Sequence, residues 1–251
     1  AHKTLLAAAL FTVSKTSLTG MVMKKTNEAA ILRSIKSIDE TPQSVHQGIN
    51  MSVANFLESI SRRRSIYNIG KNVNLSQDEI VKVIEDVVEQ SPSAFHAQSS
   101  RVVVLFGEEH QKLWNIVKET LRPMIPAEQF AQTEGKIDGC FAAGVGTALF
   151  FEDQEVIKGQ QAQFPLYADK FPEFSEQHAG MAQFIVWTAL SELGLGATLQ
   201  HYNPLIDNAV AEAWNLPVSW TLRAQMPFGS IEQAAEPKTF IARADRFKVF
   251  G

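Results

Sequence analysis

The pattern of apolar and polar positions predicts alternating helices and strands in the body of the chain. Apolar residues recur at helical spacing over residues 53–64, where they form one side of an amphipathic helix. Ser76 and Glu79 have the spacing of a capping box and precede a second apolar stripe, so a second helix is expected after Ser76. A third helix is expected over residues 108–121, and it is expected to end there because Pro123 disfavours its continuation.

Short runs of β-branched and aromatic residues predict the strands. The predicted strands are residues 101–106, 146–151, 196–202, 220–228 and a short last strand at 247–250. Residues 174–193 are apolar on nearly all sides, which indicates a helix buried in a core or between subunits. We therefore expect an α+β fold, in which helices wrap a mixed sheet around a long buried central helix.

Composition and charge narrow the class of protein. The chain has 251 residues, 45% of them hydrophobic, which suffices for one well-filled core. The net charge is −4 and the basic residues form no continuous face, so no nucleic-acid partner is expected. Cys140 is the single cysteine, and the histidines show no metal-ligand spacing. Because no apolar run reaches membrane-spanning length, we expect a soluble, cytoplasmic protein without a metal site.

Residues 1–50 differ from residues 51–251. They carry six Lys and Arg against three Asp and Glu, and an apolar patch near the start fades into Ser and Thr. Such a segment is typical of a targeting leader, but a poorly ordered or vector-derived extension has the same composition. We predict an N-terminal extension over residues 1–50 and one functional domain over residues 51–251.

A run of three arginines, Arg62 to Arg64, closes the first predicted helix and is followed by Ser65. Cations are favourable at a helix C-terminus, so a solvated surface cluster is one interpretation. The other is capture of a phosphate, because guanidinium groups and a hydroxyl offer several donors to its oxygens. The run alone does not decide between them.

A polar turn at residues 91–98 follows the second predicted helix, which Pro92 cannot continue. Ser93, His96 and Gln98 offer neutral donors and acceptors, as the edges of a heteroaromatic ring require. A plain connecting loop remains the alternative.

Candidates in the last quarter of the chain are weaker. The Gly194-Leu195-Gly196 segment follows a helix and opens a strand, the reverse of a dinucleotide fingerprint, so a helix cap and a close turn are expected. Gln200 and His201 are candidates because polar residues at the end of a strand often bind ligands. Lys238 and Arg246 are candidate cations, but isolated Lys and Arg are mostly exposed, so plain surface charges are the alternative.

These segments, in this order, resemble the nitroreductase family of FMN-dependent oxidoreductases, and in particular its short, Frm2-like (fatty-acid-repression) branch. The resemblance is carried by residues 63–67, 91–101, 194–196, 199–204, 237–238 and 246–250. It implies an intertwined homodimer with two FMN molecules at the subunit interface. It also implies a ping-pong reaction, in which NADH or NADPH reduces the flavin and the flavin reduces a nitroaromatic or quinone acceptor.

The resemblance implies roles for individual residues. Arg63, Arg64 and Ser65 hold the phosphate and ribityl chain, Lys238 is a second phosphate cation, and Arg62 is dispensable. His96 stands where many family members have asparagine, and an imidazole replaces only one of the amide's hydrogen bonds. The implied cofactor-binding set is Arg63, Arg64, Ser65, Tyr67, Ser93, His96, Gln98, Gln200, His201, Lys238 and Arg246. The flavin carries the chemistry, so no catalytic side chain is expected. A flavin-binding sensor without turnover and a dimer without a cofactor are the alternatives.

Overall fold

The structure is a computed structural model that describes residues 42–251, and the side chains from residue 52 onward. The chain divides into two compact units, Ala1–Met51 and Ser52–Gly251. Most of the extension predicted at residues 1–50 lies outside the described residues. Helix α2 (Pro42–Arg62) leads into the second unit and includes most of the first predicted helix.

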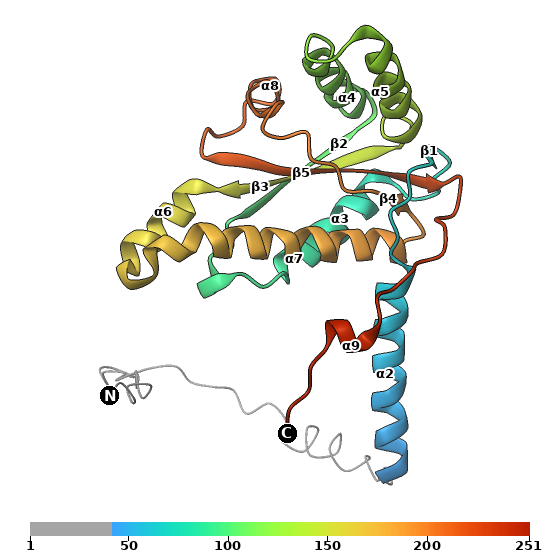
Figure 1. The fold of residues 1–251 in the computed structure, drawn as a ribbon, viewed down its shortest axis with the longest axis vertical. Coiled ribbons are helices and arrows are strands. Elements are labelled where there is room, and N and C mark those ends of the chain that lie inside the picture. Colours follow the sequence, from blue (N-terminus) through green and yellow to red (C-terminus); the bar gives the residue numbers. More distant parts are fainter. Residues whose placement is uncertain (1–41) are drawn as a thin grey trace, which may run out of the picture. The chain divides into compact units, whose positions relative to one another are not determined.

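An antiparallel sheet forms the centre of the second unit (Figure 1). Its order is β1 (Ile69–Gly70), β5 (Trp220–Ile231), β3 (Gly146–Asp153) and β2 (Ser100–Phe106), with β4 (Gly196–Ala197) also paired to β5. All of these ladders are antiparallel. An isolated bridge between Ser65 and Ala197 supplies the parallel pairing of the expected mixed sheet.

Helices cover both faces of the sheet (Figure 1). One face carries α3 (Gln77–Glu89) and α7 (Phe171–Glu192), and the other carries α4 (Gly107–Leu121), α5 (Ala127–Cys140) and α8 (Asp207–Ala213). Strand β3 separates two cores, because Ala148 and Phe150 pack toward α3 and α7 while Leu149 and Phe151 pack toward α4 and α5. The fold class is therefore α+β, as predicted, with the sheet buried on both sides.

The strongest local signals in the sequence form the elements they predict. The Ser76 hydroxyl accepts from the Glu79 backbone N–H at 3.2 Å, and the Glu79 carboxylate accepts from the Ser76 N–H at 2.8 Å, which completes the capping box of α3. The long apolar helix is α7, which buries Ala182, Val186 and Leu190. Gly194 follows it with φ +77°, a conformation that favours glycine.

Strand β5 contains a bulge that the sequence does not reveal. Phe150 of β3 faces Ala224, whereas Phe151 faces Leu222, so Arg223 is the extra residue. Leu222 therefore packs in the core beside α4, while Ala224 packs in the core beside α7.

Two strand predictions differ from the structure. The strand predicted at 196–202 is reduced to Gly196–Ala197 plus a bridge between Gln200 and Gln225. Residues 247–250 form no strand within this chain, because they follow the short helix α9 (Arg243–Arg246) and are exposed, with no strand of the described residues beside them. Among the described residues, the prediction missed the helices α5, α6 (Gln154–Gln163), α8 and α9 and the short 3-10 helices η1 (Ala94–His96) and η2 (Pro165–Lys170).

Candidate functional site

Arg62, at the end of α2, has acidic partners within the protein. Its guanidinium forms ion pairs with Glu58 at 2.7 Å and with Glu192 at 3.3 Å. The hydrogen bond to Glu58 and the charge of Glu192 raise the pKa of Arg62. Its charge is thus already neutralised, which supports the prediction that Arg62 is not needed for anion binding.

Arg63 and Arg64 lie in a different environment. The guanidinium carbon of Arg63 lies 4.4 Å from the centroid of the Trp187 ring, and its Nε is buried without a hydrogen-bond partner among the described residues. Arg64 donates to the backbone carbonyl oxygen of Glu236. In the part of the chain with described side chains, neither arginine forms an ion pair with a carboxylate.

Lys238 joins these two arginines, and we refer to Arg63, Arg64 and Lys238 as the cation cluster. The Lys238 ammonium donates to the carbonyl oxygen of Ser61 at 3.2 Å, which ties the C-terminal segment to the end of α2. Desolvation and the charges of Arg63 and Arg64 lower the pKa of Lys238. Burial and the charge of Arg64 likewise lower the pKa of Arg63. Cations that repel one another in this way are stabilised by a bound anion.

A cleft of about 430 Å³ opens beside the cation cluster. It is lined by residues 64–68 and 233–237, so the predicted residues Arg64, Ser65 and Tyr67 share it. The hydroxyl-bearing side chains of Ser65 and Tyr67 are exposed. The structure therefore brings together the first predicted motif and the segment that precedes Lys238, and the hydrogen-bonded residues Arg64 and Glu236 are 172 positions apart in the chain.

The polar turn adopts a backbone conformation that is uncommon for its residues. It contains the short helix η1 (Ala94–His96), and the φ angles of Phe95, His96 and Gln98 are +53°, +54° and +49°. Positive φ costs about 1–3 kcal/mol for each non-glycine residue. The Ser93 hydroxyl accepts from the Gln98 backbone N–H at 2.9 Å, while the side chains of His96 and Gln98 are exposed, with their Nε2 atoms 3.0 Å apart.

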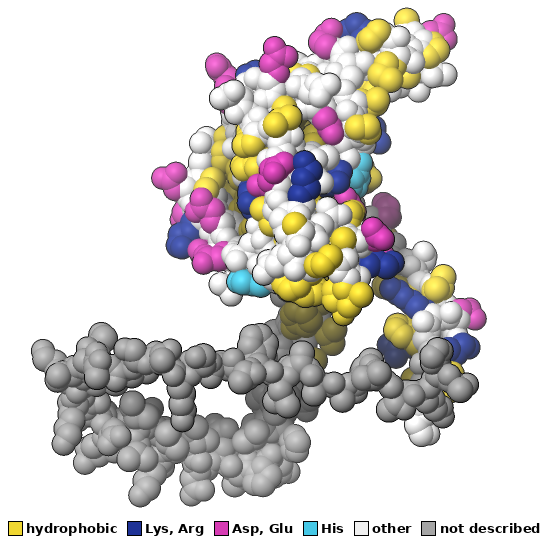
Figure 2. Space-filling view, turned by 90° about the vertical axis from the view of Figure 1, so that its left-hand side faces the viewer, with side chains coloured by type: hydrophobic (Ala, Val, Ile, Leu, Met, Phe, Trp, Pro, Cys, Tyr) yellow, Lys and Arg dark blue, Asp and Glu magenta, His cyan; other side chains and the backbone are white. Residues whose placement is uncertain are grey.

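Aromatic side chains pack against the turn. The ring centroid of Phe95 lies 4.7 Å from Phe164, 5.4 Å from Phe171 and 6.1 Å from Tyr167. Phe95 is nevertheless half exposed, and a space-filling view from the α6 side shows hydrophobic side chains gathered on the surface of this part of the molecule (Figure 2). The turn therefore lies beside an apolar surface.

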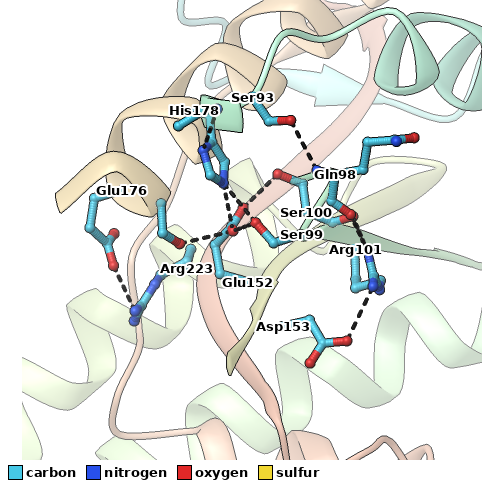
Figure 3. A network of polar contacts seen from close by, with 12 residues as sticks. Ser93, Gln98, Ser99, Ser100, Arg101, Glu152, Asp153, Glu176, His178 and Arg223 are labelled. Carbon is cyan, nitrogen blue, oxygen red and sulfur yellow. Dashed lines mark hydrogen bonds and ion pairs between the residues drawn. The ribbon is translucent and has the colours of Figure 1, made fainter. Parts of the chain in front are cut away.

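A buried carboxylate lies beneath the turn, at the end of β3 (Figure 3). Glu152 is fully buried and accepts hydrogen bonds from Ser99 at 2.6 Å, Ser100 at 2.5 Å, Ser175 at 2.9 Å and His178 at 3.0 Å. Burial alone raises the pKa of Glu152, but the hydrogen bonds from His178, Ser100 and Ser99 outweigh it, so its pKa lies below the usual range. Glu152 is therefore an anion with at least one hydrogen-bond donor on each of its oxygens.

Sequence reasoning missed Glu152 and His178. The available signal is a carboxylate that continues an apolar strand, because Glu152 directly follows Phe150 and Phe151. A charged residue in a fully buried position is rarely found without partners. Its partners lie 52, 53, 23 and 26 positions away, so nothing local in the sequence indicates them.

Within one chain, the cation cluster and the turn contact different parts of α7. Arg63 contacts Trp187, whereas the Ala94 N–H donates to Nδ1 of His178 at 3.5 Å. These two helix positions are separated by about 14 Å at 1.5 Å per residue. Within a single chain, the cation cluster and the polar turn therefore do not lie directly beside each other.

The remaining predicted residues are scattered. Gln200 donates from Nε2 to Thr198 at 3.0 Å, and His201 beside it is exposed. Arg246 is exposed in α9, with its guanidinium over Phe247. No group of three or more His, Cys, Asp or Glu side chains among the described residues could hold a metal ion. None of the described helices is both long and apolar enough to cross a membrane.

Comparisons with known proteins agree with this fold. The model of the nitroreductase family matches residues 60–230. Over 76% of its length the chain is 35% identical to HBN1 of Saccharomyces cerevisiae, covering 95% of that protein, and over 74% it is 31% identical to yeast FRM2, covering 93%. The structure of the nitroreductase CinD from Lactococcus lactis with chloramphenicol is 51% identical, with a TM-score of 0.72, and covers 78% of this chain and 100% of that one. With its two-faced antiparallel sheet and these relatives, the chain belongs to the nitroreductase family of oxidoreductases, in the Frm2-like branch.

Proposed function

We propose that this protein binds FMN and uses it to reduce small nitroaromatic or quinone acceptors with electrons from NADH or NADPH, in a ping-pong cycle. FMN supplies the electron transfer when it is bound, and the protein binds and orients it. The cation cluster carries this proposal, because three neighbouring cations have no carboxylate partner among the described residues. The proposal assigns FMN binding to residues 51–251 and a cytoplasmic location to the protein.

A phosphate monoester fits the cation cluster. Guanidinium groups match pairs of phosphate oxygens, and the buried Nε of Arg63 is a donor that still lacks an acceptor. The exposed Ser65 hydroxyl adds a neutral donor at the same cleft. A phosphate dianion would also offset the repulsion from Arg63 and Arg64, which together with desolvation lowers the pKa of Lys238. A nitroreductase from Desulfovibrio desulfuricans with the same fold, at 20% identity and a TM-score of 0.56, has been solved in complex with FMN.

We propose a homodimer with FMN at its interface. The turn that offers His96 and Gln98 lies about 14 Å along α7 from the residue that supports Arg63. Two chains related by a two-fold axis can place the turn of one beside the cation cluster of the other. Such a dimer also accounts for Met181 and Phe184, which α7 leaves 48% and 42% exposed.

The C-terminal segment supports the same dimer. Phe247, Val249 and Phe250 are exposed, and the backbone at Phe247 is extended. Strand β2 is the last in the sheet order, so one of its edges has no neighbour in the described chain, and a groove of about 540 Å³ lies between it and α3. An apolar extended segment from a second copy can pair with such an edge.

Small aromatic acceptors are consistent with the apolar surface beside the turn. CinD, 51% identical, has been solved with chloramphenicol and with 4-nitrophenol. Phe95 and Tyr167 expose aromatic surface next to His96 and Gln98, where an aromatic acceptor can stack. This observation favours the reductase over a sensor that only holds flavin.

The test is spectroscopic. Purified protein is titrated with FMN while flavin fluorescence and melting temperature are followed, and the loaded protein is then mixed anaerobically with NADH or NADPH. We expect FMN binding to quench the flavin fluorescence and to raise the melting temperature. NADH or NADPH should then bleach the bound flavin, and 4-nitrophenol should restore its colour. Binding without bleaching would favour the sensor, and absence of both quenching and stabilisation would refute FMN binding.

A further inference from the structure

Glu152 is connected to both ends of the polar turn (Figure 3). On the C-terminal side, its carboxylate accepts from Ser99 at 2.6 Å and from Ser100 at 2.5 Å. On the N-terminal side, His178 donates to Glu152 at 3.0 Å and accepts from the Ala94 N–H at 3.5 Å. One buried anion therefore fixes the residues that enter and leave the turn.

The hydrogen-bond partners define the protonation of this network. Because the Ala94 N–H donates to Nδ1 of His178, that nitrogen carries no proton, and Nε2–H is the donor toward Glu152. Nε2 also lies 2.7 Å from the Ser99 hydroxyl, whose own proton is directed to the carboxylate. The Ser175 hydroxyl is a third donor to Oε2.

The turn has local hydrogen bonds, from the Gln98 N–H to Ser93 and from Arg101 to the Gln98 carbonyl oxygen, but its backbone conformation also needs support at its two ends. Phe95, His96 and Gln98 all have positive φ, which L-residues rarely adopt without imposed contacts. The side chains of His96 and Gln98 are exposed and hydrogen-bond only to each other among the described residues. Their positions therefore depend on how the ends of the turn are fixed.

We propose that Glu152 and His178 are positioning residues of the flavin site, which hold the turn so that His96 and Gln98 meet the ring edge of FMN. This inference rests on the proposed function, because it takes the turn to be the part that contacts the ring. Neither residue is assigned a contact with the flavin. They act by keeping the turn in one conformation before the cofactor arrives.

A second buried histidine provides a matched control. His110 lies in the core beside α4, with Nδ1 2.8 Å from the Thr147 hydroxyl and Nε2 3.2 Å from the Ala142 carbonyl oxygen. It is as buried as His178 and has two polar partners where His178 has three, but none of its partners belongs to the turn. His178→Gln and His110→Gln therefore both disturb a buried network, and only the first releases the turn.

The test compares Glu152→Gln and His178→Gln with His110→Gln in two measurements. In the protein without flavin, hydrogen exchange of peptides covering residues 91–100 is expected to speed up only in the first two variants. In FMN titrations, the same two variants are expected to raise Kd about tenfold or more and to shift the bound-flavin absorbance, because a buried donor loses its acceptor. His110→Gln should leave both unchanged at a comparable loss of melting temperature.

Ser100→Ala and Ser100→Thr keep the test decisive if the stronger variants do not fold. Ser100→Ala removes one bond to Glu152 and should raise Kd, and Ser100→Thr restores the hydroxyl and should rescue it. Unchanged exchange at residues 91–100, or a Kd that follows melting temperature equally in all variants, would overturn the inference. If the wild-type protein binds no FMN, the proposed function is overturned instead. The hydrogen-exchange measurement needs no flavin, so it still tests whether Glu152 and His178 hold the turn.

Discussion

The guanidinium of Arg63 stacks on the indole of Trp187, with its carbon 4.4 Å from the ring centroid. The indole N–H donates to the carbonyl oxygen of Ala197 at 3.1 Å, and the same oxygen accepts from the Ile66 N–H at 2.9 Å. The ring is thus fixed between α7, β4 and the segment after Arg64. Because the ring is fixed and the guanidinium lies over it, the tertiary structure also sets the position of the Arg63 charge.

Trp187→Leu should weaken FMN binding without removing a charge. Loss of a cation–π contact costs about 0.5–2 kcal/mol, so Kd is expected to rise by about twofold to thirtyfold. Fluorescence titration measures the effect, and Trp187→Phe, which retains an aromatic face, should recover part of it. Equal Kd values for the Leu and Phe variants would contradict a stacking role.

Replacing Arg63 and Arg64 together by alanine should reduce FMN affinity by several kcal/mol, about 3 to 5, because charge-assisted hydrogen bonds to phosphate are strong. Arg62→Ala is the matched control, since its partners Glu58 and Glu192 already neutralise it. The control should leave the Kd for FMN within about twofold of the wild-type value. If the flavin content of the double variant equals that of wild type, the phosphate lies elsewhere.

Stability should fall in acid partly because of His110. Desolvation lowers the pKa of His110 to about 4, so the folded protein keeps it neutral where the unfolded chain, with a pKa of 6.5, already binds a proton. Its contribution is complete above pH 6.5 and is lost as the pH falls toward 4, by about 2 kcal/mol between pH 7.5 and 5. Denaturant unfolding at both pH values should show a smaller pH dependence for His110→Gln than for wild type, and an identical dependence would disprove the assignment.

Light scattering at micromolar concentration should give the mass of a dimer. Substituting Phe247, Val249 and Phe250 together by serine is expected to shift the protein toward monomer, because these exposed side chains are proposed to cover the partner's β2 edge. Leu166 and Val218 are 86% and 101% exposed, and their substitution by serine is the matched control. If the variant with the three tail substitutions stays as dimeric as the control variant, the interface lies elsewhere.

Much of the fold follows from local patterns, but several elements do not. The capping box of Ser76 and Glu79 and the apolar sequence of α7 act within a few residues, so both helices were predictable. Helix α5 was missed because Gly135 and Gly139 lower its helix propensity, and it forms by packing Phe130 and Ile137 into the core. The tail at 247–250 has strand composition, yet a strand exists only beside another strand edge.

The sequence by itself determined that Arg62 to Ser65 and residues 91–98 are the polar segments that break the apolar pattern, since charge and turn chemistry are local properties. Tertiary structure alone decided which of these groups act together. It paired Arg62 with Glu192 and placed Arg63 over Trp187, without an ion-pair partner among the described side chains. The register of β2 and β3 places Ser100 opposite Glu152, and the path of α7 adds His178. Such partners are set by how strands and helices cross, and side-chain spacing along the chain does not encode that crossing.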